Sequence, residues 1–254
     1  MDGPTQKLRR ANIHLNAFQR SLKRFMDRKP HEISHKVVRE DDGSYGTIYV
    51  SRCDPIPDSM ALIVGDICNN LRSVLDHILW QLWLKADSTF DQNVTFPIFA
   101  DPNRFKREAA RHIEGLDAVQ RTLIANVQPY RRGNDLLSVL RELNDADKHR
   151  LITIVRAMAQ YTNIHISGHF IIPPKGSIKI YAPAKSGLEY GTELLRYPLE
   201  YLKPGAEAAV DANFNILIVF GEFPNIAEGR IVGTTLRAIR DEVTYVLDRF
   251  REFL

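Results

Sequence analysis

The sequence predicts an α+β fold, in which a helical bundle carries an added antiparallel sheet and is closed by a C-terminal helix. Apolar residues recur every three to four positions in the first part of the chain, which is the spacing of helices packed on a core. β-branched residues and turn-forming residues then dominate, which is typical of strands. We expect a single domain over 1–254, with a mostly helical part at 1–159 and antiparallel strands plus the last helix at 160–254.

A first helix is expected from Thr5 to about Arg28, because one stripe of apolar residues runs along it. The stripe consists of Leu8, Ala11, Leu15, Phe18, Leu22 and Phe25. Arginine and lysine side chains fall on the opposite side. Such a basic face can contact nucleic acid or another anionic partner, although charge on the outer face of a core helix is more often simply solvated.

The next segment, 35–53, predicts a β-hairpin, because "HKVVRE" and "YGTIYVSR" flank an Asp-Gly turn. A helix then follows at about 60–85. "FPIF" at Phe96–Phe99 indicates an extended apolar plug, since Pro97 disfavours a helix there. Two shorter helices are expected at about 103–112 and 116–126.

A long helix is expected at about 134–159. Four strands are then expected in "NIHISGHFIIPP", "SIKIYAP", "TELLRYPLE" and "FNILIVFGE". The early hairpin is a candidate to join their sheet. The last helix, about 230–254, carries a heptad-like stripe of Val232, Leu236, Ile239, Val243, Val246, Phe250 and Phe253. Such a stripe packs on another helix, either within the chain or in a second copy.

Composition and missing motifs exclude several classes of protein. The hydrophobic fraction of 44%, the charged fraction of 26% and the net charge of +3 are ordinary for a globular protein. The N-terminus lacks the apolar core of a signal peptide, and no apolar run reaches the ~18 residues of a membrane span, so we expect a cytoplasmic protein without membrane contact. The two cysteines, Cys53 and Cys68, match no zinc or disulfide pattern. Nucleotide, hydride, acyl-transfer and zinc-protease motifs are absent, and we expect no cofactor.

The stretch "NNLRSVLDHILW" places polar groups inside an otherwise apolar helix. At about 100° per residue, these groups form one contiguous stripe opposite the apolar side. Its members are Asn69, Arg72, Ser73, Asp76, His77 and Trp80. Arg72 stands one turn from Asp76, and Ser73 one turn from His77.

The long helix offers a partner for this stripe. Asp147 falls in the middle of its apolar side, with Asn144 at the edge. A buried carboxylate needs a cation or several donors. We expect that cation to be Arg72 or His77 from the other helix, or Lys148 or Arg150 beside Asp147.

Three explanations compete for this polar seam. It can be a structural ion-pair network that fixes how two helices dock. It can be a metal site, for which His77, His149, Asp76, Asp147 and His14 offer ligands, although no repeated Glu-x-x-His pattern is present. It can also perform acid–base chemistry on a phosphodiester, in which a histidine moves a proton and an arginine holds the developing negative charge.

The residues of "RSVLDH" are similar to the Arg-x4–6-His motif of the HEPN superfamily, small helical proteins of which many are metal-independent ribonucleases that act as dimers. The resemblance implies that Arg72 stabilises the phosphate, His77 is the acid–base residue and Ser73 is the polar residue after the arginine. The strings "GDICNNLRSVLDHILW", "FPIF", "QPY" and "LNDADKHR" also resemble a group of bacterial proteins without an established activity.

The resemblance favours a metal-independent endoribonuclease with a toxin or defence role. Its candidate catalytic residues are Arg72, His77, Asp76 and Ser73, and its supporting residues are Asp147, Asn144, Lys148, Asn69 and Trp80. The partners expected from the resemblance are RNA, a second copy of the chain, and an antitoxin or another protein. The alternative is a non-catalytic binding or scaffold protein whose polar seam is structural, and the third hypothesis is a metal-binding hydrolase.

Overall fold

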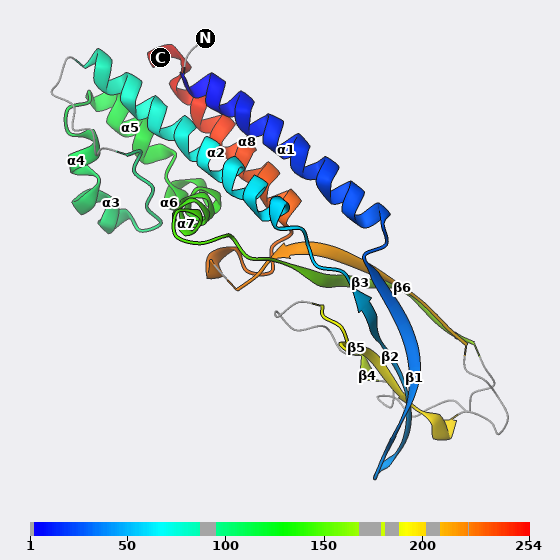
Figure 1. The fold of residues 1–254 in the computed structure, drawn as a ribbon. Coiled ribbons are helices and arrows are strands. Elements are labelled where there is room, and N and C mark those ends of the chain that lie inside the picture. The colour runs from blue at the N-terminus through cyan, green and yellow to red at the C-terminus, as the bar shows by residue number, and fades with distance from the viewer. Residues whose placement is uncertain (1–2, 87–94, 168–178, 181–187, 202–208, 223) are drawn as a thin grey trace.

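The computed structural model describes residues 3–86, 95–167, 179–180, 188–201, 209–222 and 224–254. Its helices and two antiparallel sheets confirm the α+β class. Helices form one part of the molecule and strands extend from one end of it (Figure 1). Within the described ranges, none of the helices combines the length and the apolar character that a membrane crossing requires.

Three long helices lie side by side in the helical part: α1 (Gly3–Asp27), α2 (Asp58–Lys85) and α8 (Val232–Phe250) (Figure 1). The hairpin between α1 and α2 makes α2 run opposite to α1, and α8 runs in the direction of α2. A fourth helix, α7 (Leu136–Asp147), packs against α2 and α8. The described N- and C-terminal ends therefore lie close together at one end of the bundle.

The apolar stripes that predict α1 and α8 form the core between these helices. Ala11, Leu15, Phe18 and Phe25 of α1 are buried. The predicted stripe of α8 is buried from Val232 to Phe250 by contacts with α1, α2 and α7. The intramolecular interpretation of this stripe is therefore confirmed, and the stripe is not available to a second copy of the chain.

Four short helices connect α2 to α7 along the chain. They are α3 (Pro102–Glu108), α4 (Ala110–Ile113), α5 (Ala118–Asn126) and α6 (Pro129–Arg132). Asp101 caps α3, because its side chain accepts hydrogen bonds from two backbone N–H groups of the first turn. Asp117 forms a capping box with Gln120 at the start of α5.

The strands form two sheets. The first has the order β1 (His31–Glu40), β2 (Gly43–Cys53), β5 (Glu193–Pro198) and β4 (Lys179–Ile180). The second pairs β3 (Ile154–Ser167) with β6 (Ala209–Phe220). Short 3-10 turns occur at Leu199–Tyr201, Asn225–Ala227 and Arg251–Phe253. The pairing of β2 with β5 confirms that the early hairpin joins the later strands.

The long helix predicted at about 134–159 is wrong in its second half. Helix α7 ends at Asp147, and β3 begins at Ile154. The residues between α7 and β3, and those of β3 itself, are rich in β-branched side chains, which favour a strand over a helix. Pairing of Ile154 with Phe220 on β6 supplies the backbone partners. The strand expected from "NIHISGHFIIPP" thus begins earlier, and its residues from 168 on lie outside the described part of the chain.

Candidate functional site

Arg72 and Asp76 face each other on α2 and together hold the backbone of Phe96. The Arg72 guanidinium lies 3.0 Å from the Asp76 carboxylate. Nη2 of Arg72 donates to the carbonyl oxygen of Phe96 at 2.8 Å, and the Phe96 N–H donates to Oδ1 of Asp76 at 2.9 Å. The pair therefore satisfies both backbone polar groups of one residue of the FPIF segment.

The rest of the FPIF segment is held in the same way. Nε2 of Gln128 donates to the Pro97 carbonyl, and Oε1 of Gln128 accepts from the Phe99 N–H, both at 2.9 Å. Nη1 of Arg141 donates to the Ile98 carbonyl at 2.7 Å. Phe96–Phe99 belongs to no sheet, so side chains take the place of a neighbouring strand. We call these four side chains, Arg72, Asp76, Gln128 and Arg141, the FPIF clamp.

The prediction of an apolar plug outside any helix at Phe96–Phe99 is confirmed, because the segment belongs to no helix and Phe96, Pro97 and Ile98 are buried. Sequence reasoning missed two members of the clamp. Gln128 stands in the "QPY" string just before α6, and Arg141 lies in the middle of α7. A buried apolar segment containing proline needs hydrogen-bond partners for its carbonyl groups, and this need is the signal that could have led to both residues.

His77 faces a different neighbour from Arg72. Five positions separate the two residues, which is about 140° around the helix. His77 lies against the start of α1, where a Cβ added to Gly3 would overlap with its Nδ1 atom. Arg72 instead lies against Phe96. The described contacts thus do not bring the two residues to one point, whereas acid–base catalysis on a phosphate requires both at the same phosphate.

The other candidates on α2 have local roles. The Ser73 hydroxyl donates to the Asn69 carbonyl one turn earlier at 2.8 Å, a common bond for serine inside a helix. Asn69 is exposed, and Trp80 is 43% exposed. Trp83, one turn further, is the buried tryptophan, and its indole N–H donates to the His112 carbonyl at 2.9 Å.

The expectation that Asp147 pairs with Arg72 or Lys148 is wrong, because both cations have other partners. Arg72 pairs with Asp76, and Lys148 pairs with Asp145 at 3.2 Å. Asp147 instead packs against Gly65 of α2, two turns before Arg72 on the same face. Burial raises the pKa of Asp147, and the nearby carboxylate of Asp66 raises it further. Asn144 is buried in α7, as its place beside the apolar side predicts.

The five metal-ligand candidates are not gathered into one site. His14 lies 3.7 Å from Asp66, His149 is exposed, and Asp76 is engaged by Arg72. Among the residues that the structure describes, no three or more histidine, cysteine or acidic side chains are placed to hold a metal ion. Burial also raises the pKa of the Cys68 thiol, which makes it a poor nucleophile.

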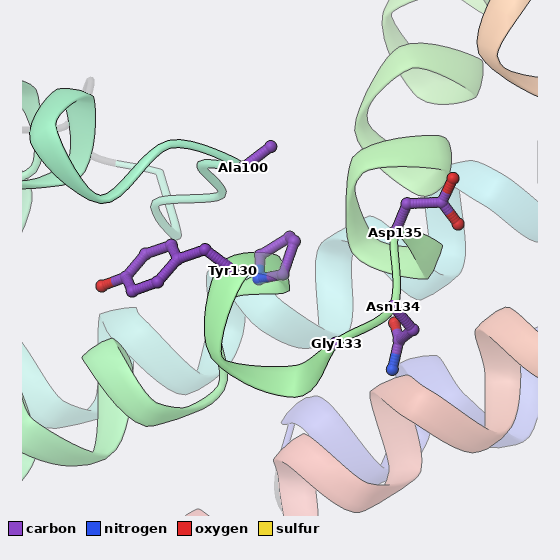
Figure 2. Close-up of a pocket in the computed structure, with 6 residues that line it drawn as sticks. Ala100, Tyr130, Gly133, Asn134 and Asp135 are labelled. Carbon is purple, nitrogen blue, oxygen red and sulfur yellow. The ribbon is translucent and has the colours of Figure 1, made fainter.

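A cavity of about 400 Å³ lies beside α6 and the start of α7, lined by Ala100, Pro129, Tyr130, Gly133, Asn134 and Asp135 (Figure 2). Its polar side chains already have partners: Asp135 accepts from Arg230 at 3.0 Å, and Asn134 donates to Glu242 at 3.4 Å. In Figure 2 the Tyr130 hydroxyl and the Asp135 carboxylate point away from each other. The cavity therefore lacks converging polar groups.

The outer face of α1 carries concentrated positive charge. The helix contains six basic side chains and one acidic one, a net charge of +5, while the whole chain has +3, so the rest of the chain has −2. The exposed cations are Arg9, Arg10, Arg20, Lys23 and Arg24. Lys23 pairs with Asp27 at 2.7 Å. Among the described residues, no ion pair within 4.0 Å involves the four arginines of this set.

Comparison of the chain with protein-family models, with curated proteins and with solved structures found no match.

Proposed function

We propose that the chain is a non-catalytic binding protein that contacts RNA through the basic outer face of α1, with the FPIF clamp as a structural element. The observation that carries the proposal is the charge distribution: α1 has a net charge of +5 in a chain of +3. Cations without carboxylate partners are available to phosphate groups, because no internal ion pair has to be broken first.

The dimensions of α1 suit a polyanion. Its 25 residues span roughly 37 Å, with cations near both ends and a further arginine, Arg28, just beyond the last turn. Several phosphates of one strand can therefore be neutralised at the same time. Binding of this kind is electrostatic and weakly dependent on nucleotide sequence.

A membrane surface is a poorer partner for the same face. Amphipathic helices bind membranes through an exposed apolar side, whereas the apolar stripe of α1 is buried in the core. Ile13, 47% exposed, is a single apolar side chain among the exposed cations. RNA is the partner that the resemblance of "RSVLDH" to the HEPN motif implies, whether or not Arg72 and His77 act on it, and DNA is the alternative that the experiment separates from it.

The FPIF clamp argues against catalysis by Arg72. The Arg72 side chain is only 12% exposed, and it is committed to Asp76 and to the Phe96 carbonyl. Binding a phosphate there would break both contacts and leave the Phe96 carbonyl without its donor. The polar seam is thus better explained as the structural network of the alternative hypothesis.

Fluorescence anisotropy with a labelled single-stranded RNA tests the proposal. We expect the triple variant Arg9→Gln, Arg20→Gln, Arg24→Gln to weaken RNA binding at least about tenfold, since three phosphate contacts are lost. The matched control is Arg104→Gln, Arg107→Gln, Arg111→Gln, which removes three cations from α3 and α4 and should leave the affinity unchanged. Equal losses in both variants, or equal binding of DNA, would contradict the proposed site or the preference for RNA.

A cleavage assay in the presence of a chelator separates binding from catalysis. We expect the labelled RNA to remain intact. Cleavage that is lost in both Arg72→Lys and His77→Ala, while both variants stay folded, would overturn the non-catalytic proposal and establish the ribonuclease.

A further inference from the structure

A second cavity, of about 360 Å³, lies between α1, β6 and the first turn of α8. Its walls are mainly apolar: Phe18, Leu22 and Met26 come from α1, Ile216 and Ile218 from β6, and Ile231 precedes α8. The volume falls in the range of pockets that hold small molecules, roughly 300–1,000 Å³. The cavity can therefore enclose a compact aliphatic group.

One end of this cavity is positively charged. Arg237 lines it and is exposed, and its hydrogen bond to Thr234 in its own helix is 3.5 Å long. No ion pair within 4.0 Å joins Arg237 to a carboxylate in the described part of the chain. Ile231 at the N-cap has no polar side chain to accept from the first N–H groups of α8, which adds a partial positive charge at the same end. No acidic residue lies in the first turn of α8.

We propose that this cavity binds an aliphatic carboxylate, such as a medium-chain fatty acid anion. The hydrocarbon chain lies between α1 and β6, and the carboxylate accepts hydrogen bonds from Arg237. The combination of an apolar wall and one unpaired arginine selects a molecule with both an apolar body and a negative end. The proposal is independent of RNA binding, because none of the exposed cations of α1 lines the cavity.

Gly233 offers a way to close the cavity without disturbing the fold. It lines the cavity, and a Cβ added there would lie 3.8 Å from Arg237 and from Phe18, an ordinary contact distance. A larger side chain would extend from that position into the cavity. Because glycine is the weaker helix former, the substitution should not destabilise α8.

Isothermal titration calorimetry with decanoate tests the proposal on the full chain. We expect saturable binding of one decanoate, weaker binding of decanol and no binding of decyltrimethylammonium. Arg237→Gln should weaken decanoate about tenfold or more while leaving decanol unchanged, since a charge-assisted hydrogen bond is lost. Gly233→Leu should abolish binding of both.

The matched control is Arg249→Gln, which removes an arginine from the far end of α8, where it contacts Tyr245. It should bind decanoate like the unchanged protein. The absence of saturable decanoate binding would overturn the proposal. So would equal affinities for decanoate and decanol, or unchanged binding by a Gly233→Leu variant with a native circular dichroism spectrum.

Discussion

At the scale of single residues, the FPIF clamp shows how side chains replace a missing strand. Phe96–Phe99 belongs to no helix or sheet, and its backbone groups are bonded to Arg72, Asp76, Gln128 and Arg141. Buried backbone groups without such partners would each carry a desolvation cost. The polar residues of α2 that attract attention as catalytic candidates therefore have a structural reason to be there.

The clamp makes Arg72 important for stability. We expect Arg72→Ala to lower the free energy of unfolding by about 1–3 kcal/mol, because Asp76 and the Phe96 carbonyl lose their partner. Urea denaturation measures the change. The control is Arg251→Ala, which breaks the exposed ion pair with Asp248 at the C-terminal end of α8 and should cost at most about 0.5 kcal/mol. Equal costs for the two variants would contradict the role of the clamp.

Asp147 makes stability depend on pH. Burial raises its pKa in the folded protein, so the folded state favours the protonated carboxyl. The protonated Asp147 carboxyl contributes its whole stabilisation below the unfolded pKa of about 4, and this stabilisation is lost as pH rises through the folded pKa. We expect Asp147→Asn to raise the melting temperature at pH 7 and to have no effect below about pH 4. Asp145→Asn, at an exposed position, is the control. A gain that is independent of pH would contradict the explanation.

At the scale of elements, Gly65 leaves room on α2 for the Asp147 carboxylate of α7. A Cβ at this position would overlap with the carboxylate of Asp147. Gly65 is buried inside α2, where alanine would otherwise be the better helix former by about 1 kcal/mol. The close approach therefore outweighs helix propensity at this position.

We expect Gly65→Ala to destabilise the protein by about 1–3 kcal/mol, because either the Asp147 carboxylate must leave its place against α2 or the two helices must move apart. The double variant Gly65→Ala, Asp147→Ala should recover most of that loss, since the overlapping carboxylate is removed. Chemical denaturation of the two single variants and the double variant measures the coupling. Additive effects would show that the two residues do not meet.

At the scale of the whole molecule, charge is divided unevenly. Helix α1 is strongly basic, while the remaining residues together are slightly acidic. Arg72 and Arg132 are paired with carboxylates, and the Arg132–Glu242 pair joins α6 to α8. The outer face of α1 thus carries a dense group of cations without carboxylate partners.

This distribution predicts how RNA binding depends on salt. If the four exposed arginines of α1 that have no carboxylate partner each contact one phosphate of a single strand, the logarithm of the binding constant should fall with the logarithm of salt concentration with a slope of about −2.8. Anisotropy titrations at several salt concentrations measure it. A slope near zero would show that α1 does not bind RNA through phosphates.

The buried faces of the long helices could be predicted from the amino-acid sequence alone. The apolar stripes of α1 and α8, the early hairpin and the buried plug at Phe96–Phe99 were all predictable, because local periodicity and turn chemistry are read within a few residues. The hairpin turn itself lies at Asp41 and Asp42 rather than at the predicted Asp-Gly pair, since Gly43 already pairs with Glu40. The end of α7 at Asp147 could not be predicted in this way, because it depends on the pairing of β3 with β6, which joins segments far apart in the chain. The tertiary structure also decided that Arg72 bonds Phe96 rather than Asp147. A polar side chain takes the partner that packing brings to it, and spacing along one helix cannot reveal that partner.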